Sequence, residues 1–131
     1  MIAFIANTVV VDDSDEDFIL VGFAHERDGD YHEAIHFQRA YEFDEQDTAL
    51  GMNKVYIERG SQLRSAYGGI ESVSLSRNRI QITLSENTAR SLGDEEFEIS
   101  FDVPVAEFRT LLDGLSKVFD GQVALTVNCV G

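Results

Sequence analysis

The stretch "PVAEFRTLLDGLSKVFDG", Pro104 to Gly121, decides the fold class. Proline is acceptable in the first turn of a helix, and glycine is typical just beyond its end. Between them, seven apolar residues recur at helical spacing and form one stripe: Val105, Phe108, Leu111, Leu112, Leu115, Val118 and Phe119. The pattern predicts one long amphipathic helix that packs on an apolar surface.

The sequence before this helix is typical of strands. Residues 2–11 are rich in β-branched side chains and predict one strand, which the acidic turn "DDSDED" follows. The segment "FILVGFAH", Phe18 to His25, is apolar at successive positions, which predicts a central strand covered on both faces. Asp28-Gly29 predicts a hairpin turn. In the next predicted strand, "HEAIHFQRA", Ile35 and Phe37 share one face.

Further alternating segments extend the sheet. Apolar residues two apart predict strands around residues 54–58, 63–67, 73–75, 80–84 and 97–101, and a last strand at 123–127. "SENTARSLG" predicts a short helix with Ser85 as N-cap and Gly93 as its end. The expected fold is α+β: a mainly antiparallel sheet with one long C-terminal helix packed on a face and a short helix before it. We expect residues 1–131 to form a single domain.

Negative charge is the strongest signal in the composition. The chain has 24 acidic residues against 10 Lys and Arg, for a net charge of -14. Residues 1–50 hold 13 of the acids and two basic residues, Arg27 and Arg39. Such a field repels nucleic-acid phosphates and attracts basic proteins. Solubility alone is the competing explanation for this acidity.

The residues do not favour a metal site or an enzyme. His32 and His36 would share one face of a strand but lie about 13 Å apart along it, too far for one ion. Phe18 stands where a calcium loop that starts at Asp13 needs glycine. No nucleophile elbow, P-loop or dinucleotide-binding turn occurs. We therefore expect no catalytic residue, no cofactor and no metal.

Other features favour a protein of the cytoplasm. The sequence has neither a membrane-spanning apolar run nor the basic flank of a signal peptide. The single cysteine, Cys129, cannot form an internal disulfide, and buried inert cysteine is its default interpretation. We expect a bacterial, cytoplasmic protein.

Three sequence segments resemble the Immunity protein 10 family of bacterial polymorphic-toxin systems. They are "FDEQDTALGM" (Phe43 to Met52), "VYIE" (Val55 to Glu58) and "YGGI" (Tyr67 to Ile70), and together with supporting features the similarity spans roughly residues 16–120. The resemblance implies an α+β immunity protein that binds and neutralises a cognate toxin without catalysis. It implies no cofactor, and the toxin could be a nuclease with a basic cleft.

The interface is inferred from physical argument. Its candidate acids are Glu42, Asp44, Glu45 and Asp47, which could equally cap a helical turn. Tyr56 and Glu58, on the exposed face of the next strand, are candidates for closer contact because interfaces favour aromatic anchors beside charged rims. Gly51, Gly68 and Gly69 are expected to form tight turns. Alternatives are a small-molecule-binding or enzymatic domain, or a module that forms homo-oligomers through a sheet edge.

Overall fold

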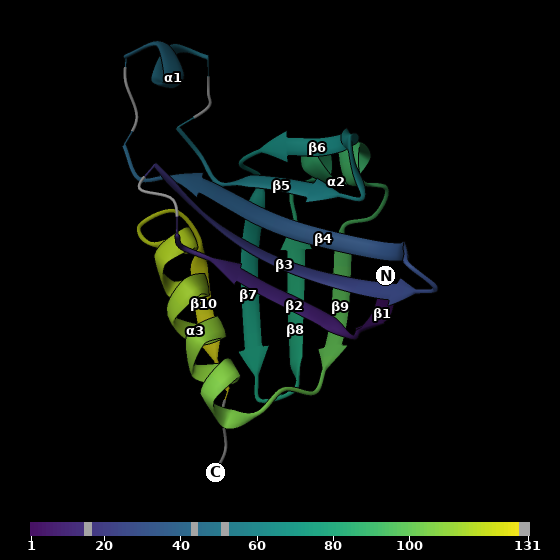
Figure 1. The fold of residues 1–131 in the computed structure, drawn as a ribbon. Helices are drawn as coiled ribbons and strands as arrows, with labels where there is room; N and C mark the ends of the chain where they lie inside the picture. The colour runs from purple at the N-terminus through teal and green to yellow at the C-terminus, as the bar shows by residue number, and fades with distance from the viewer. Residues whose placement is uncertain (15–16, 43–44, 51–52, 129–131) are drawn as a thin grey trace.

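The protein consists of two five-stranded sheets and three helices in a computed structural model that describes residues 1–14, 17–42, 45–50 and 53–128 (Figure 1). In sheet A the strand order is β1 (Ile2–Ala6), β9 (Glu96–Phe101), β8 (Arg79–Leu84), β7 (Ile70–Ser76) and β10 (Ala124–Val127). In sheet B the order is β2 (Thr8–Asp12), β3 (Phe18–Arg27), β4 (Asp30–Ala40), β5 (Tyr56–Arg59) and β6 (Ser61–Tyr67). The helices are α1 (Glu45–Ala49), α2 (Glu86–Leu92) and α3 (Val105–Phe119).

The predicted α+β class is confirmed, but the strands form two layers instead of one sheet. Pairing is antiparallel throughout sheet B, whereas the edge strands of sheet A, β1 and β10, pair in parallel with β9 and β7. The strands of sheet B cross those of sheet A at a steep angle in Figure 1. Each sheet directs alternate apolar side chains into the space between them, which is the arrangement of a packed sandwich.

The expected single strand over residues 2–11 is wrong, because the chain changes sheets at Asn7. Ala6 pairs with Phe101 in sheet A, and Thr8 already pairs with Ala24 in sheet B. The Asn7 side chain holds the crossing: its Nδ2 donates to Glu26 O at 2.6 Å, and Glu26 N donates to its Oδ1 at 2.8 Å. The amide side chain of Asn7 thus makes the two hydrogen bonds with the Glu26 backbone that a paired strand would otherwise make.

Helix α3 packs on the inner face of sheet B, beside strand β10 of sheet A, as Figure 1 shows. Five of the seven stripe residues are buried, while Leu112 is half-buried and Val105 is 56% exposed. Val105 is the first residue of the helix. At the other end of α3, the ring centres of Phe119 and Phe37 lie 4.9 Å apart.

Gly114 allows the closest approach between α3 and sheet B. This glycine is buried, and a Cβ atom placed on it would lie 2.7 Å from Val11 Cγ1 and 3.3 Å from Val21 Cγ2. Both valines point inward from sheet B, so the missing side chain sets the distance between the helix and the sheet.

Arg59, on β5, pairs with Glu33 of the neighbouring strand β4 and links sheet B to α2 and to sheet A. Arg59 Nε and Nη2 donate to the Glu33 carboxylate at 3.0 and 2.9 Å, and Nη1 donates to Leu92 O at 2.8 Å. The guanidinium also lies 5.5 Å from the centre of the Phe97 ring in sheet A. Burial by itself would raise the pKa of Glu33, but the hydrogen bonds and charge of Arg59 outweigh it and lower the pKa below 4.5.

Most local expectations are confirmed. Asp28 and Gly29 both have positive φ in the β3–β4 turn, and β7–β8 is the predicted hairpin. Ser85 accepts a hydrogen bond from Thr88 N at the start of α2, and Gly93 ends this helix in the left-handed conformation. The tail forms β10, as expected. Gly51 and Cys129 lie outside the described residues.

We predict that Gly114→Ala destabilises the protein although alanine favours helix by about 1 kcal/mol over glycine. The new methyl group would overlap Val11, and overpacking of this kind costs about 1–3 kcal/mol. Urea unfolding measures the difference. The double variant Gly114→Ala/Val11→Ala should recover part of the loss, and Arg109→Ala on the exposed side of α3 should change stability by less than about 0.5 kcal/mol. A stabilised Gly114→Ala variant would contradict the close approach.

We also predict a loss of stability in acid that depends on Glu33. Since its folded pKa lies below the unfolded value of 4.5, the unfolded state binds more protons as the pH falls. The stabilisation is complete above about pH 4.5 and is lost as the pH falls through the folded pKa. Glu33→Gln should therefore show a shallower decline in unfolding free energy below that pH. Glu71→Gln, an exposed matched change, should keep the wild-type slope.

Candidate functional site

The outer face of sheet B, which points away from sheet A, is the most distinctive surface of the molecule. Strand β3 is an interior strand of sheet B, and the predicted burial of both its faces is confirmed in part, because the outer face is buried at two positions and half-buried at Leu20. Ile19, Val21 and Phe23 are buried against the second layer. On the other face, Gly22 and Ala24 are buried and Leu20 is half-buried, and all three line a hollow.

Strand register places the outward side chains in two rows across the sheet. One row runs through Leu20, Gln38, Tyr56 and Tyr67, and the next through Gly22, His36, Glu58 and Ser65. The β5–β6 side of each row is polar or aromatic, whereas the β3 side is small or apolar. This division places a carboxylate and two phenol rings beside an apolar floor.

Two adjoining hollows occupy this face. The larger has a volume of about 810 Å³ and lies over β4, β5 and β6, with Phe18, Lys54 and Gln62 among its lining residues. The smaller, of about 260 Å³, extends over β2 and β3, where small side chains form its floor. Leu20, His36 and Glu58 line both hollows, so they stand at the boundary between them.

Glu58 is the charged group at this boundary. Its side chain is 17% exposed, and Tyr56 Oη donates a hydrogen bond of 2.6 Å to its Oε1. His36 Nδ1 lies 3.8 Å from Oε2. Burial of His36 lowers its pKa below 6.5 and outweighs the opposing attraction of Glu58, so the imidazole is neutral at pH 7. The negative charge of Glu58 is therefore not balanced by His36.

Two tyrosines form an aromatic surface next to Glu58. The ring centres of Tyr56 and Tyr67 lie 5.0 Å apart, and those of Tyr56 and His36 lie 6.0 Å apart. Tyr67 is 44% exposed. Burial, followed by the hydrogen bond to Glu58, raises the pKa of Tyr56, which keeps its hydroxyl protonated and donating. Half-exposed tyrosines of this kind are common anchors in protein interfaces.

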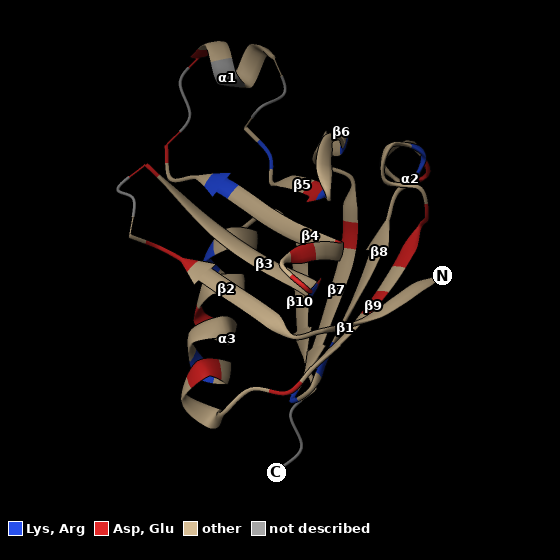
Figure 2. Ribbon diagram, turned by 45° about the vertical axis from the view of Figure 1, so that its right-hand side comes forward, with Lys and Arg blue, Asp and Glu red and all other residues tan. Residues whose placement is uncertain are grey.

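The acidic segment after β4 lies near one end of this face. Glu42 and Glu45 are exposed. Asp44 lies outside the described residues, and the side chain of Asp47, which belongs to α1, does as well. Figure 2 shows acidic segments at the ends of both β2 and β4, on the same side of the molecule. The structure thus brings two sequence-distant acidic stretches to one end of sheet B.

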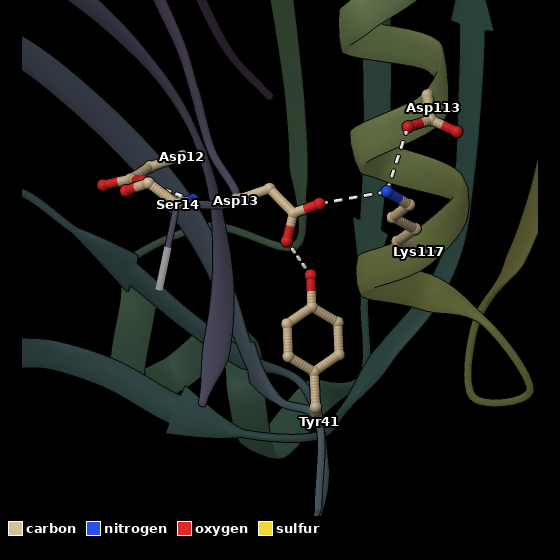
Figure 3. A network of polar contacts seen from close by, with 6 residues as sticks. All are labelled: Asp12, Asp13, Ser14, Tyr41, Asp113 and Lys117. Atoms are coloured by element: carbon tan, nitrogen blue, oxygen red, sulfur yellow. Dashed lines mark hydrogen bonds and ion pairs between the residues drawn. The ribbon is translucent and has the colours of Figure 1, made fainter. Parts of the chain in front are cut away.

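Part of this acidity is neutralised by a lysine of the C-terminal helix α3, although residues 1–50 themselves hold only two basic residues. Asp13 accepts hydrogen bonds from Tyr41 Oη and from Lys117 Nζ, the latter at 3.0 Å (Figure 3). Lys117 also pairs with Asp113 at 3.3 Å, and these two carboxylates raise its pKa above 10.5. Asp12 accepts from Ser14 instead. The contacts tie the β2–β3 turn to β4 and α3.

Other kinds of site find no support in the described residues. Within them, no group of three or more His, Cys, Asp or Glu side chains could hold a metal ion. His32 and His36 lie on the same extended strand, β4, as the spacing argument assumed. None of the described helices has the length and hydropathy to cross a membrane.

Gly68 and Gly69 serve structure, as expected. Both have φ of +81°, and the pair joins β6 of sheet B to β7 of sheet A. Gly68 O accepts from Thr88 Oγ1 at 3.1 Å, and Gly69 O accepts from Ser85 N at 2.7 Å, which fixes α2 on this junction. Among the described residues, Thr88 is the one buried polar or charged side chain, with 6% of its surface exposed.

Tyr56 and Glu58 lie on the outer face of sheet B, as the alternation predicted, but the sequence did not predict which residues surround them. Leu20, His36, Gln38 and Tyr67 come from three other strands, and only register brings them together. One signal was present: Gly22 and Ala24 occupy outward positions of a strand where a solvated sheet would carry polar residues. Small residues at these positions form part of the floor of the smaller hollow.

These features define a two-layered α+β protein with a hollowed, tyrosine-lined sheet face. Exposed acids at one end of this face, including Glu42 and Glu45, form an acidic rim. The sequence profile of the Immunity protein 10 family matches residues 5–109. The chain belongs to the Immunity protein 10 family. No curated protein and no solved structure matches it.

We predict that Gly69→Ala disrupts the junction far more than the same change at Gly29. Both residues have positive φ, so alanine is strained at either position by about 1–2 kcal/mol. At Gly29 nothing lies within 4 Å of the added Cβ, whereas at Gly69 it would lie 1.8 Å from Thr88 Oγ1. Thermal unfolding of the two variants separates backbone strain from steric overlap. Equal melting temperatures would show that α2 can move away without cost.

Proposed function

We propose that this protein is an immunity protein that binds a cognate bacterial toxin and neutralises it without catalysis, with the outer face of sheet B as the contact surface. Family membership supports the general role. The observation that carries the choice of surface is the larger hollow on the outer face of sheet B, where half-buried Leu20 and exposed Tyr67 line the same cavity. A partner that covers it would bury apolar area that the chain itself leaves open.

The hollow and the acidic rim would act at different stages of binding. Exposed carboxylates at the end of sheet B, including Glu42 and Glu45, attract a basic partner over a distance and speed its encounter. Contacts in the hollow, with Tyr56 and Glu58 at their centre, then slow dissociation. A positively charged toxin surface, such as the cleft of a nuclease, suits both stages. The cytoplasm is the compartment where such protection would be needed.

The test is protection together with association kinetics. The protein encoded beside this one is the toxin candidate, and cells that express it should survive only when the wild-type immunity protein is present. Glu42, Asp44, Glu45 and Asp47 are each changed to Lys in one variant. Its association rate should fall and its salt dependence should weaken, because salt screens charges over about 10 Å at 0.1 M.

A matched control carries the same change in net charge elsewhere. Glu71, Glu95, Glu96 and Asp102 are exposed acids outside sheet B, and their reversal to Lys should slow association much less. Tyr67→Ala should act mainly on the dissociation rate. If both fourfold charge reversals slow association equally, the association rate depends on net charge and not on the position of the acids. Full protection and unchanged dissociation with Tyr67→Ala would place the interface away from this face.

A further inference from the structure

Glu58 differs from every other half-buried carboxylate among the described residues. Four acids are half-buried there: Glu33, Glu58, Asp94 and Glu98. Glu33 pairs with Arg59, Asp94 with the N-terminal ammonium at 3.2 Å, and Glu98 with Arg79 at 3.0 Å. Within the described part of the chain, the polar partners of the Glu58 carboxylate are the Tyr56 hydroxyl and the His36 imidazole. A carboxylate withdrawn from water without a permanent cation is costly unless a ligand supplies one.

The surroundings of Glu58 fit one kind of cation. The neighbouring rings of Tyr56 and Tyr67 can stack against a flat cation. Leu20 and Phe18 supply an apolar floor for a hydrocarbon stem. Arginine combines a planar, forked donor group with such a stem, whereas lysine carries a compact, strongly hydrated ammonium. Arginine already stacks on aromatic rings elsewhere in this protein: the guanidinium carbons of Arg59 and Arg77 lie 5.5 and 5.0 Å from the centres of the Phe97 and Phe108 rings.

Lys54 lines the same hollow but forms no ion pair with Glu58. It is exposed and lies at the β5 end of the hollow, next to the Gly68 turn. It therefore leaves the carboxylate available to a second cation. The Glu58 carboxylate also has room for further hydrogen bonds. Each of its oxygens can accept more than one, and Tyr56 uses a single acceptor position on Oε1.

We propose that the large hollow of sheet B is an arginine-binding site, in which a side chain of the partner protein pairs its guanidinium with Glu58 and stacks on Tyr56 and Tyr67. The inference rests on the proposed function for the identity of the partner, but the chemistry of the site can be tested without the toxin. The occupant replaces the missing cation beside Glu58, and its stem covers part of the apolar floor that the chain leaves open.

The experiment titrates the isotope-labelled protein with N-acetyl-arginine methylamide at concentrations up to tens of millimolar and follows backbone amide shifts. The citrulline analogue, which has the same shape without the charge, and the lysine analogue are the comparison probes. We expect saturable shifts at Tyr56, Glu58 and Ser65 with arginine, weaker ones with lysine and none with citrulline. Glu58→Gln should weaken arginine binding about tenfold or more, as expected for loss of a charge-assisted hydrogen bond.

Glu98→Gln is the matched control. Its carboxylate is 21% exposed, close to the 17% of Glu58, but it lies on sheet A and is already paired with Arg79. This variant should bind the arginine probe like the wild type. The inference is overturned if arginine causes no shifts in the hollow, if citrulline or lysine binds equally well, or if Glu58→Gln binds as tightly as Glu98→Gln.

Failure of this inference can be told apart from failure of the proposed function. If arginine does not bind but Tyr67→Ala still impairs toxin binding, the surface is right and its occupant is not arginine. If arginine binds as expected but neither Tyr67→Ala nor Glu58→Gln changes toxin binding, the arginine site is supported and the proposed toxin interface is overturned.

Discussion

The structure depends on covering the inner face of sheet B with two different elements. Sheet A packs over one part of this face and α3 over the other, beside β10. Because sheet A and α3 share one surface of sheet B, the residues where each of them meets sheet B must pack closely. Gly114 brings the helix close to Val11 and Val21, and Gly69 with Thr88 joins the two sheets at the opposite side. These glycines matter because close packing leaves no room for a methyl group there.

The same packing determines what remains available for binding. With its inner side filled, sheet B can meet a partner only through its outer face or its edges. Strand β3 is apolar on both faces, and its outer face is buried less completely, because Leu20 remains half-buried at the hollow. The network of Asp13, Tyr41 and Lys117 holds the β2–β3 turn against β4 and α3, and so fixes one boundary of the outer face. A rigid, partly apolar surface loses little entropy on binding.

Local features of the fold could be predicted from the sequence, whereas the division into layers could not. Period-two patterns, the Ser85 cap and the stripe of α3 depend on neighbouring residues, and the structure confirms them. The change of sheet at Asn7 depends on hydrogen bonds to Glu26, nineteen residues away, which no local pattern encodes. For the same reason Tyr56 and Glu58 could be found as outward residues of one strand, but their neighbours His36 and Tyr67 could not.

Charge pairing explains why Glu58 and the acidic rim are different kinds of acid. Rim carboxylates such as Glu42 are hydrated, so their negative charge costs little and acts mainly through the long-range field. Glu58 is withdrawn from water between Tyr56 and a neutral His36, so its charge acts at short range and is strengthened by its surroundings. Elsewhere the chain matches half-buried acids with its own cations, as Arg59 does for Glu33. The exception at Glu58 lies in a hollow of about 810 Å³, where a cation from another protein has room to enter.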